Sequence, residues 1–208
     1  MLASGADPRY RVEEGEFKGY FPLCVASQEG NVEVIQALVA GGAYPNQVEP
    51  KCSGSSLYIA AQPNHARAIA ALVKAGADVN LASSEGCTPL NRAVQSGNRE
   101  AVVALLVARA AVNVANDQGV SPLYYAAQKG LAEILKLLLR AKAEVDQADI
   151  CGGTPLTIAA ANGQLACVDL LLAGRANVHH KDNYGRSALD YATHFKRTAV
   201  EAVLRAKI

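Results

Sequence analysis

The sequence predicts an all-α fold, a solenoid of helix-turn-helix units joined by β-turn or hairpin loops. One six-residue pattern recurs six times, and the spacing between its central leucines is 34 residues once and 33 residues four times. These leucines are Leu23, Leu57, Leu90, Leu123, Leu156 and Leu189. An apolar stripe with helical spacing follows the pattern. A fixed period of this length is typical of repeat folds, in which each unit buries its apolar faces against its neighbours.

Residues 116–148 show how one complete unit specifies its two helices. Ser121 is a favourable N-cap, and Pro122 fits the first helical position because its missing N–H would have no intrahelical partner there. Gly130 is expected to end this first helix, since glycine adopts the left-handed conformation at least cost. Residues 131–139 then carry the apolar stripe of the second helix. Neither helix can bury its apolar face alone, so the units must stack.

The six copies of the pattern are FPLCVA, SSLYIA, TPLNRA, SPLYYA, TPLTIA and SALDYA. A period of 33 residues with T-P-L-x-x-A at its centre resembles the ankyrin repeat, a turn followed by two antiparallel helices. The resemblance covers residues 2–208 and implies a single ankyrin repeat domain over 1–208. Its predicted parts are a partial repeat and insertion at 1–15, repeats at 16–48, 49–82, 83–115, 116–148 and 149–181, and a C-terminal capping repeat at 182–208.

The sequence departs from the family at the histidine of T-P-L-H. The residues found there are Cys24, Tyr58, Asn91, Tyr124, Thr157 and Asp190. In the family this histidine ties adjacent turns together, so its replacement predicts a somewhat less stable array. Tyr58 and Tyr124 are expected to be structural. Arg92 is expected to be a half-buried stem with its charge in water. Asn64 stands where a helix-ending glycine is expected, and asparagine tolerates the left-handed conformation.

Composition narrows the classes of partner and the compartment. A formal net charge of +1 provides no general field for nucleic acid or an acidic membrane, so neither is expected as a partner. The longest uncharged apolar run, residues 101–108, is too short to span a membrane. The N-terminus has no basic segment followed by an apolar core, as a secretory signal would have. Five scattered cysteines indicate a reducing, intracellular compartment: the cytoplasm, with the nucleus as the alternative.

No recognised catalytic pattern occurs in the sequence. G-x-S-x-G, H-E-x-x-H, the P-loop and G-x-G-x-x-G are missing, so no nucleophile, metal site or phosphate cradle is predicted. His179 and His180 are adjacent, and neighbouring residues do not converge easily on one metal. The chain is therefore expected to be non-enzymatic and to need no cofactor or metal.

The resemblance implies binding of an unidentified protein or peptide through turn tips and the exposed side of the first helices, which line a concave groove. We therefore expect a monomeric interaction scaffold, with a self-associating structural element as an alternative. Aromatic residues and arginine dominate most interfaces. The candidate partner-binding residues are Phe17, Lys18, Tyr20, Glu85, Gln95, Asp117, Gln118, Val120, Lys129, Ile150, Tyr184, Arg186 and Phe195. Phe17, Tyr20 and Phe195 have a second interpretation, as cover for the end repeats.

Two further interpretations concern the start of the chain and one turn. Residues 2–9 match only the close of a second helix and its exit, which favours a regulatory or targeting module of a larger protein as the alternative function. Residues 72–80 resemble the site that asparaginyl hydroxylases modify in ankyrin repeats, which makes Asn80 a candidate modification site. The alternative is that the amide of Asn80 bonds the local backbone of its turn.

Overall fold

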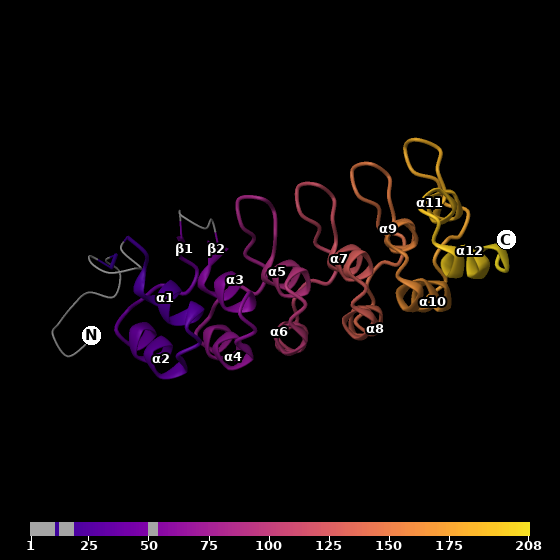
Figure 1. Ribbon diagram of the computed structural model, residues 1–208. Coiled ribbons are helices and arrows are strands. Elements are labelled where there is room, and N and C mark those ends of the chain that lie inside the picture. The colour runs from indigo at the N-terminus through magenta and orange to yellow at the C-terminus, as the bar shows by residue number, and fades with distance from the viewer. Residues whose placement is uncertain (1–10, 13–18, 50–53) are drawn as a thin grey trace. The chain divides into compact units, whose positions relative to one another are not determined.

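The computed structural model describes residues 11–12, 19–49 and 54–208, which form two compact units. Unit 1 extends to Ala111 and unit 2 runs from Val112 to Ile208. The described residues contain twelve helices and one pair of short strands (Figure 1). The predicted all-α class of helix-turn-helix units is thereby confirmed. In the described part of the chain, no helix is long and apolar enough to cross a membrane.

Unit 1 contains three helix pairs. Its first helices are α1 (Pro22–Gln28), α3 (Ser56–Ala61) and α5 (Pro89–Gln95), and its second helices are α2 (Val32–Ala40), α4 (Ala66–Lys74) and α6 (Arg99–Val107). Each first helix packs on the second helix of its pair, and helices of the same kind pack on one another along the unit. Strand β1 (Val48–Glu49) pairs antiparallel with β2 (Gly54–Ser55), with Val48 opposite Ser55.

Unit 2 repeats this arrangement. Its first helices are α7 (Pro122–Lys129), α9 (Pro155–Asn162) and α11 (Ala188–His194), and its second helices are α8 (Ala132–Arg140), α10 (Leu165–Ala173) and α12 (Thr198–Arg205). Figure 1 shows, within each unit, the first helices in one row and the second helices in another, with the long loops beyond the first helices. The loops and first helices therefore form one continuous side of each unit.

The helix ends follow the caps that the sequence predicts. Ser121 accepts a hydrogen bond from the Tyr124 N–H, α7 begins at Pro122, and Gly130 ends it in the left-handed conformation with φ 71°. Asn64 takes the same conformation with φ 67°, as expected. Four other first helices have a Ser or Thr N-cap that accepts in the same way: Ser55, Thr88, Thr154 and Ser187.

The central leucines form the core of each unit. Those of the first five copies of the pattern are buried, and Leu189 of the last copy is half-buried. The second helices also bury aliphatic side chains, such as Leu72 in unit 1 and Leu138 in unit 2. Burial of each leucine contributes about 1.5–3 kcal/mol to the stability of the fold. The core therefore holds the two rows of helices together and leaves the loops free for other contacts.

A second set of contacts connects neighbouring repeats. After four of the second helices, one Asn or Asp accepts a hydrogen bond from a backbone N–H of the following repeat. Within the two units these pairs, acceptor first, are Asn46–Asp78, Asn80–Ala111, Asn113–Glu144 and Asp146–Asn177, at 2.7, 2.8, 2.9 and 3.0 Å. Each pair satisfies a backbone donor and connects one repeat to the next at the corresponding position of the repeat.

Candidate functional site

Most predicted partner-binding residues lie on the loops and first helices. Phe17 and Lys18 lie outside the described residues. Tyr20, Gln95 and Val120 are half-buried. The exposed ones are Glu85, Asp117, Gln118, Lys129, Ile150, Tyr184, Arg186 and Phe195. The structure gathers some of these residues into two places, one in each unit, and leaves the others separate.

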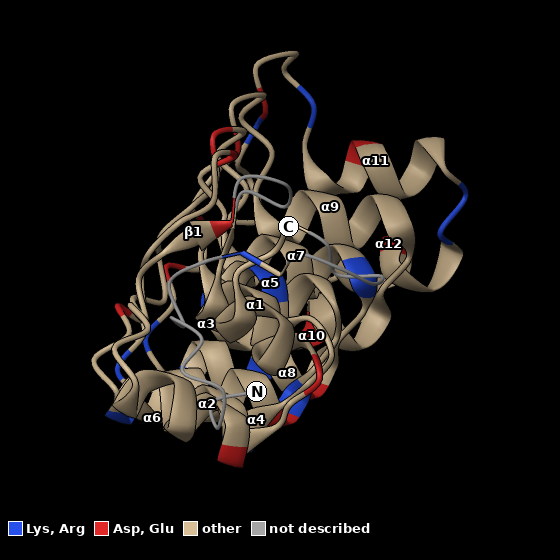
Figure 2. Ribbon diagram, turned by 90° about the vertical axis from the view of Figure 1, so that its left-hand side faces the viewer, with Lys and Arg blue, Asp and Glu red and all other residues tan. Residues whose placement is uncertain are grey.

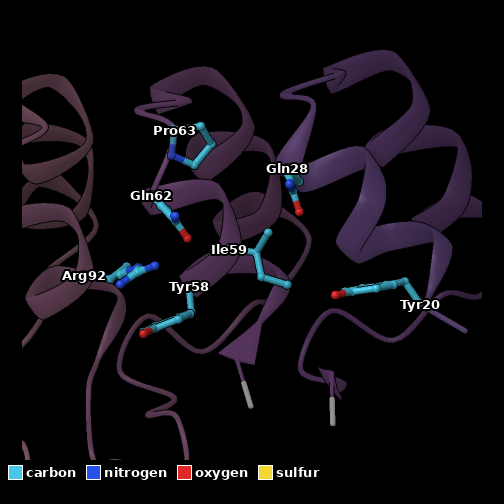
Figure 3. Close-up of a pocket in the computed structure, with 7 residues that line it drawn as sticks. All are labelled: Tyr20, Gln28, Tyr58, Ile59, Gln62, Pro63 and Arg92. Atoms are coloured by element: carbon cyan, nitrogen blue, oxygen red, sulfur yellow. The ribbon is translucent and has the colours of Figure 1, made fainter. Parts of the chain in front are cut away.

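The site of unit 1 is a pocket between the first helices. It has a volume of about 210 Å³ and is lined by Tyr20, Gln28, Tyr58, Ile59, Gln62, Pro63 and Arg92. Figure 3 shows Arg92 and Tyr58 at one end of it, Tyr20 at the other and Ile59 between them. Of the predicted binding residues only Tyr20 lines this pocket, and Gln95 contributes indirectly through Arg92. We call it the Arg92 pocket.

Arg92 is the one charged residue in the lining of the Arg92 pocket. Its guanidinium carbon lies 5.6 Å from the centroid of the Tyr58 ring, and its Nη1 donates to Gln95 Oε1 at 3.0 Å. Its Nε is buried and has no hydrogen-bond partner among the described residues. Within that part of the chain Arg92 also forms no ion pair. Arg92 is half-buried, as expected. The expectation that its charge lies in water is wrong for Nε, which is buried.

Tyr58 contributes a protonated hydroxyl beside this arginine. Burial raises the pKa of Tyr58 most strongly, with a smaller opposing effect from the Arg92 charge. Cys87 and the exposed Glu85 raise the pKa further, while a hydrogen bond with Ser83 lowers it. The hydroxyl is neutral at neutral pH, as that of an ordinary tyrosine is, and can donate a hydrogen bond.

The site of unit 2 is a stack of aromatic rings around one arginine. The Arg186 guanidinium carbon lies 4.6 Å from the centroid of the Tyr184 ring and 4.7 Å from that of Tyr191. Tyr191 in turn stacks on Phe195, with the ring centroids 6.4 Å apart. Tyr184 is 70% exposed and Phe195 is 47% exposed. These four residues, Tyr184, Arg186, Tyr191 and Phe195, are called the Arg186 stack.

A buried carboxylate holds the Arg186 stack in place. Asp182 Oδ2 accepts from the Tyr191 hydroxyl at 2.7 Å and pairs with Arg186 Nη2 at 3.0 Å. Asp182 Oδ1 accepts from the backbone N–H groups of Tyr184 and Arg186, each at 2.9 Å. Burial alone would raise the pKa of Asp182, but these hydrogen bonds outweigh it and lower that pKa to about 2. The carboxylate is therefore ionised at neutral pH and fixes the loop.

Backbone hydrogen bonds connect successive loop tips of unit 2. The Ile150 N–H donates to Gln118 O at 3.1 Å, and the Asn183 N–H donates to Cys151 O at 3.0 Å. Ile150, 60% exposed, and Tyr184 are thus presented from fixed positions. A surface held in place before binding loses less conformational entropy when a partner docks.

Charge and metal-binding groups add no further site. Figure 2 shows basic and acidic residues interspersed on the described ribbon, without a continuous basic stripe of the kind that follows a phosphate backbone. Among the described residues, no group of three or more His, Cys, Asp or Glu side chains could hold a metal ion. Asn80 is exposed, and its Oδ1 accepts from the Ala111 N–H at 2.8 Å.

Of the seven residues that line the Arg92 pocket, sequence reasoning selected only Tyr20 as a binding residue, and it missed Arg92 and Tyr58 in particular. A signal for Arg92 was available, because it is the one charged residue at its repeat position. The other copies have Val25, Ile59, Tyr125, Ile158 and Tyr191 there. The surroundings of Arg92 were not predictable, since they depend on which side chains the neighbouring repeats place around it.

Comparison with known proteins agrees with the repeat pattern. The sequence model of a family described as "Ankyrin repeats (3 copies)" matches residues 1–83, 57–149 and 123–208. The chain is 36% identical over 91 residues to "SH3 and multiple ankyrin repeat domains protein 1" of Homo sapiens, across 43% of this chain and 4% of that protein. It is 31% identical over 73 residues to "Putative ankyrin repeat protein FPV031" of Fowlpox virus (strain NVSL), across 35% of this chain and 21% of that protein. The matches thus span a small part of each relative.

Proposed function

The chain belongs to the ankyrin repeat family, a general protein–protein interaction module, and on that premise we propose that it is a non-enzymatic scaffold that binds a protein or peptide. The binding surface of the proposal is the side of each unit formed by the loop tips and first helices. One observation carries the proposal: in unit 2 that side presents an exposed, rigidly held Arg186 stack. Aromatic residues and arginine are the residue types that dominate binding energy at interfaces.

The exposure of the Arg186 stack has no explanation in the stability of unit 2 alone. Tyr191 and Arg186 are held by Asp182, but the Tyr184 and Phe195 rings leave large apolar areas in water. Burying such rings against a partner is favourable, at about 25 cal/mol per Å² of apolar surface. Tyr184 and Phe195 are therefore the residues whose removal should weaken binding without disturbing the Asp182 network.

The test is affinity purification from the native cell with the full chain as bait. A Tyr184→Ala/Phe195→Ala double variant is compared with the unsubstituted chain. We expect the recovery of specific partners, measured by mass spectrometry, to fall by about tenfold or more. The matched control is Val107→Ala, which removes an exposed apolar side chain at the end of α6, a second helix.

Three results distinguish the parts of the proposal. Loss of partners from the double variant but not from the control supports the Arg186 stack as the binding surface. Equal recovery from all three baits contradicts that assignment. Failure of the unsubstituted chain to enrich any protein above an unrelated bait of equal charge contradicts the scaffold function itself. Circular dichroism of each variant excludes unfolding as the cause of a loss.

A further inference from the structure

We infer that the Arg92 pocket of unit 1 recognises the carboxylate side chain of an aspartate or glutamate on a partner peptide, an inference that rests on the proposed protein-binding function. The first argument is charge. The lining contains one cation and no anion, and among the described residues Arg92 has no carboxylate partner. A partner carboxylate would supply the missing counter-charge in a setting that is partly shielded from water.

The second argument is the hydrogen bonding of the guanidinium. Nη1 is already engaged with Gln95, whereas the buried Nε–H has no acceptor in the described part of the chain. The unsatisfied donor therefore lies on the side edge of the planar group. A carboxylate places two acceptor oxygens side by side and matches such an edge with two parallel hydrogen bonds. Because the Nε–H is buried, the Arg92 side chain must shift for a ligand oxygen to reach it, and the hydrogen bond then satisfies a donor that is unfavourable without an acceptor.

The third argument is the size and chemistry of the walls. A volume of about 210 Å³ accommodates one amino-acid side chain and is below the range of about 300–1,000 Å³ typical of small-molecule sites. Ile59, Pro63 and the tyrosine rings offer apolar contact for the methylene groups of an acidic side chain. The Tyr58 hydroxyl is uncharged at neutral pH, so this wall of the pocket does not repel an anion.

The same charges favour one carboxylate over a phosphate group. The pocket offers a single cation, and the exposed Glu85 acts electrostatically on Tyr58 beside it. A dianionic phosphate would meet only one positive charge and would be repelled by Glu85 about twice as strongly as a carboxylate with a single charge. A carboxylate with a single negative charge is balanced by Arg92 alone.

The test uses random peptides of about ten residues displayed on phage. They are selected against the full chain, against Arg92→Gln and against Arg67→Gln. Arg67→Gln is the matched control, because Arg67 is exposed on the second helix α4 and its replacement makes the same charge change in the same unit. We expect peptides selected by the unsubstituted chain and by Arg67→Gln to share an Asp or Glu at one position, and those selected by Arg92→Gln to lack it.

One selected peptide is then used in a double-mutant cycle. Its acidic residue is changed to the matching amide, and dissociation constants are measured for the chain and for Arg92→Gln. Each single change should weaken binding by about tenfold or more, and the two together should weaken it hardly further, because both remove one interaction. Arg92→Lys keeps the charge but not the planar guanidinium group, so its dissociation constant should lie between those of the unsubstituted chain and of Arg92→Gln.

The outcomes separate the inference from the proposed function. Peptides selected without an acidic preference, or with one that persists in Arg92→Gln, overturn the inference and leave the binding function intact. A preference for a free C-terminal carboxylate that vanishes with a C-terminal amide overturns the assignment to a side chain. Additive effects in the cycle overturn direct contact. If no peptide is selected by any form of the chain, the inference fails together with peptide binding.

Discussion

Among the described residues, each unit has one buried carboxylate that is bonded to a loop or helix start, and the two carboxylates connect segments at different distances in the sequence. In unit 2, Asp182 bonds Tyr184, Arg186 and Tyr191, all within nine residues of it. In unit 1, the fully buried Glu49 accepts from the Phe21 N–H at 3.0 Å and from Arg11 Nη1 at 3.4 Å. These donors lie 28 and 38 residues before Glu49 in the sequence.

The two carboxylates differ in the range of their contacts. Asp182 orders a nearby loop, whereas Glu49 connects segments that are far apart in the sequence. Asp182 shapes its own loop and presents the Arg186 stack, so its effect should stay within the last repeat. Glu49 joins β1 to the start of α1, where the Arg11 guanidinium also lies 4.5 Å from the centroid of the Phe21 ring. Repeat proteins propagate local defects only to nearest neighbours. The two carboxylates are therefore a direct way to ask how each unit is stabilised.

The largest effect is expected for Asp182→Ala. It removes the acceptor of two backbone N–H groups, the Tyr191 hydroxyl and Arg186, so we expect unit 2 to lose about 3 kcal/mol of stability. Hydrogen exchange of the α11 and α12 amides under increasing urea measures this for unit 2 alone. Asp117→Ala, at an exposed loop tip, is the control and should change stability by less than about 0.5 kcal/mol. Equal effects of the two substitutions would contradict the role assigned to Asp182.

The counterpart in unit 1 is Glu49→Ala, with an expected loss of about 2 kcal/mol. The loss is smaller because Arg11 is partly exposed and water can solvate it when its partner is removed. Hydrogen exchange in α1 and α3 reports the effect on unit 1. Exchange in α11 should stay unchanged, and in Asp182→Ala the reverse pattern is expected. Faster exchange in both units after either substitution would show that the two carboxylates do not act locally.

The pH dependence of unit 2 tests the same comparison, and the lowered pKa of Asp182 corresponds to about 2.5 kcal/mol of stability. The pKa of Asp182 is lowered to about 2 in the folded chain, below the ordinary value of about 3.9 in an unfolded chain. Its contribution is therefore complete above about pH 4 and is lost as the pH falls toward about 2. Titration of the Asp182 carboxyl carbon by NMR should give a midpoint near 2. In Tyr191→Phe, which removes one hydrogen bond to the carboxylate, the midpoint should rise, and an unchanged midpoint would contradict the network.

The repeat period made much of the fold predictable, but it revealed neither of the two buried carboxylates. Leucine spacing, Ser/Thr caps and Gly130 indicated the helices, since each acts through residues close in sequence. The Asn and Asp residues that tie repeats together recur at the same period and could have been found in that way. Glu49 could not, because its partners are distant and no periodic pattern connects them. For the same reason the candidate site was predicted at Tyr184 and Arg186, two residues apart, but not at Arg92.

The ends of two second helices, α4 in unit 1 and α8 in unit 2, provide the comparison with the smallest expected effects, which are of opposite sign. After α4, Gly76 has the left-handed conformation with φ 88°, and after α8, Lys142 has it with φ 65°. A side chain in this conformation costs about 1 kcal/mol relative to glycine.

Lys142→Gly should therefore stabilise unit 2 by about 0.5–1 kcal/mol, and Gly76→Ala should destabilise unit 1 by about 1 kcal/mol. An added Cβ at Gly76 meets no atom within 4 Å, so the cost there is conformational rather than steric. Hydrogen exchange in α8 and α4 measures the two changes separately. Lys142→Ala is the control that removes the same side chain but keeps the strained backbone, and it should leave stability nearly unchanged. If Lys142→Ala stabilised unit 2 as much as Lys142→Gly, loss of the lysine itself rather than relief of the backbone would be the cause.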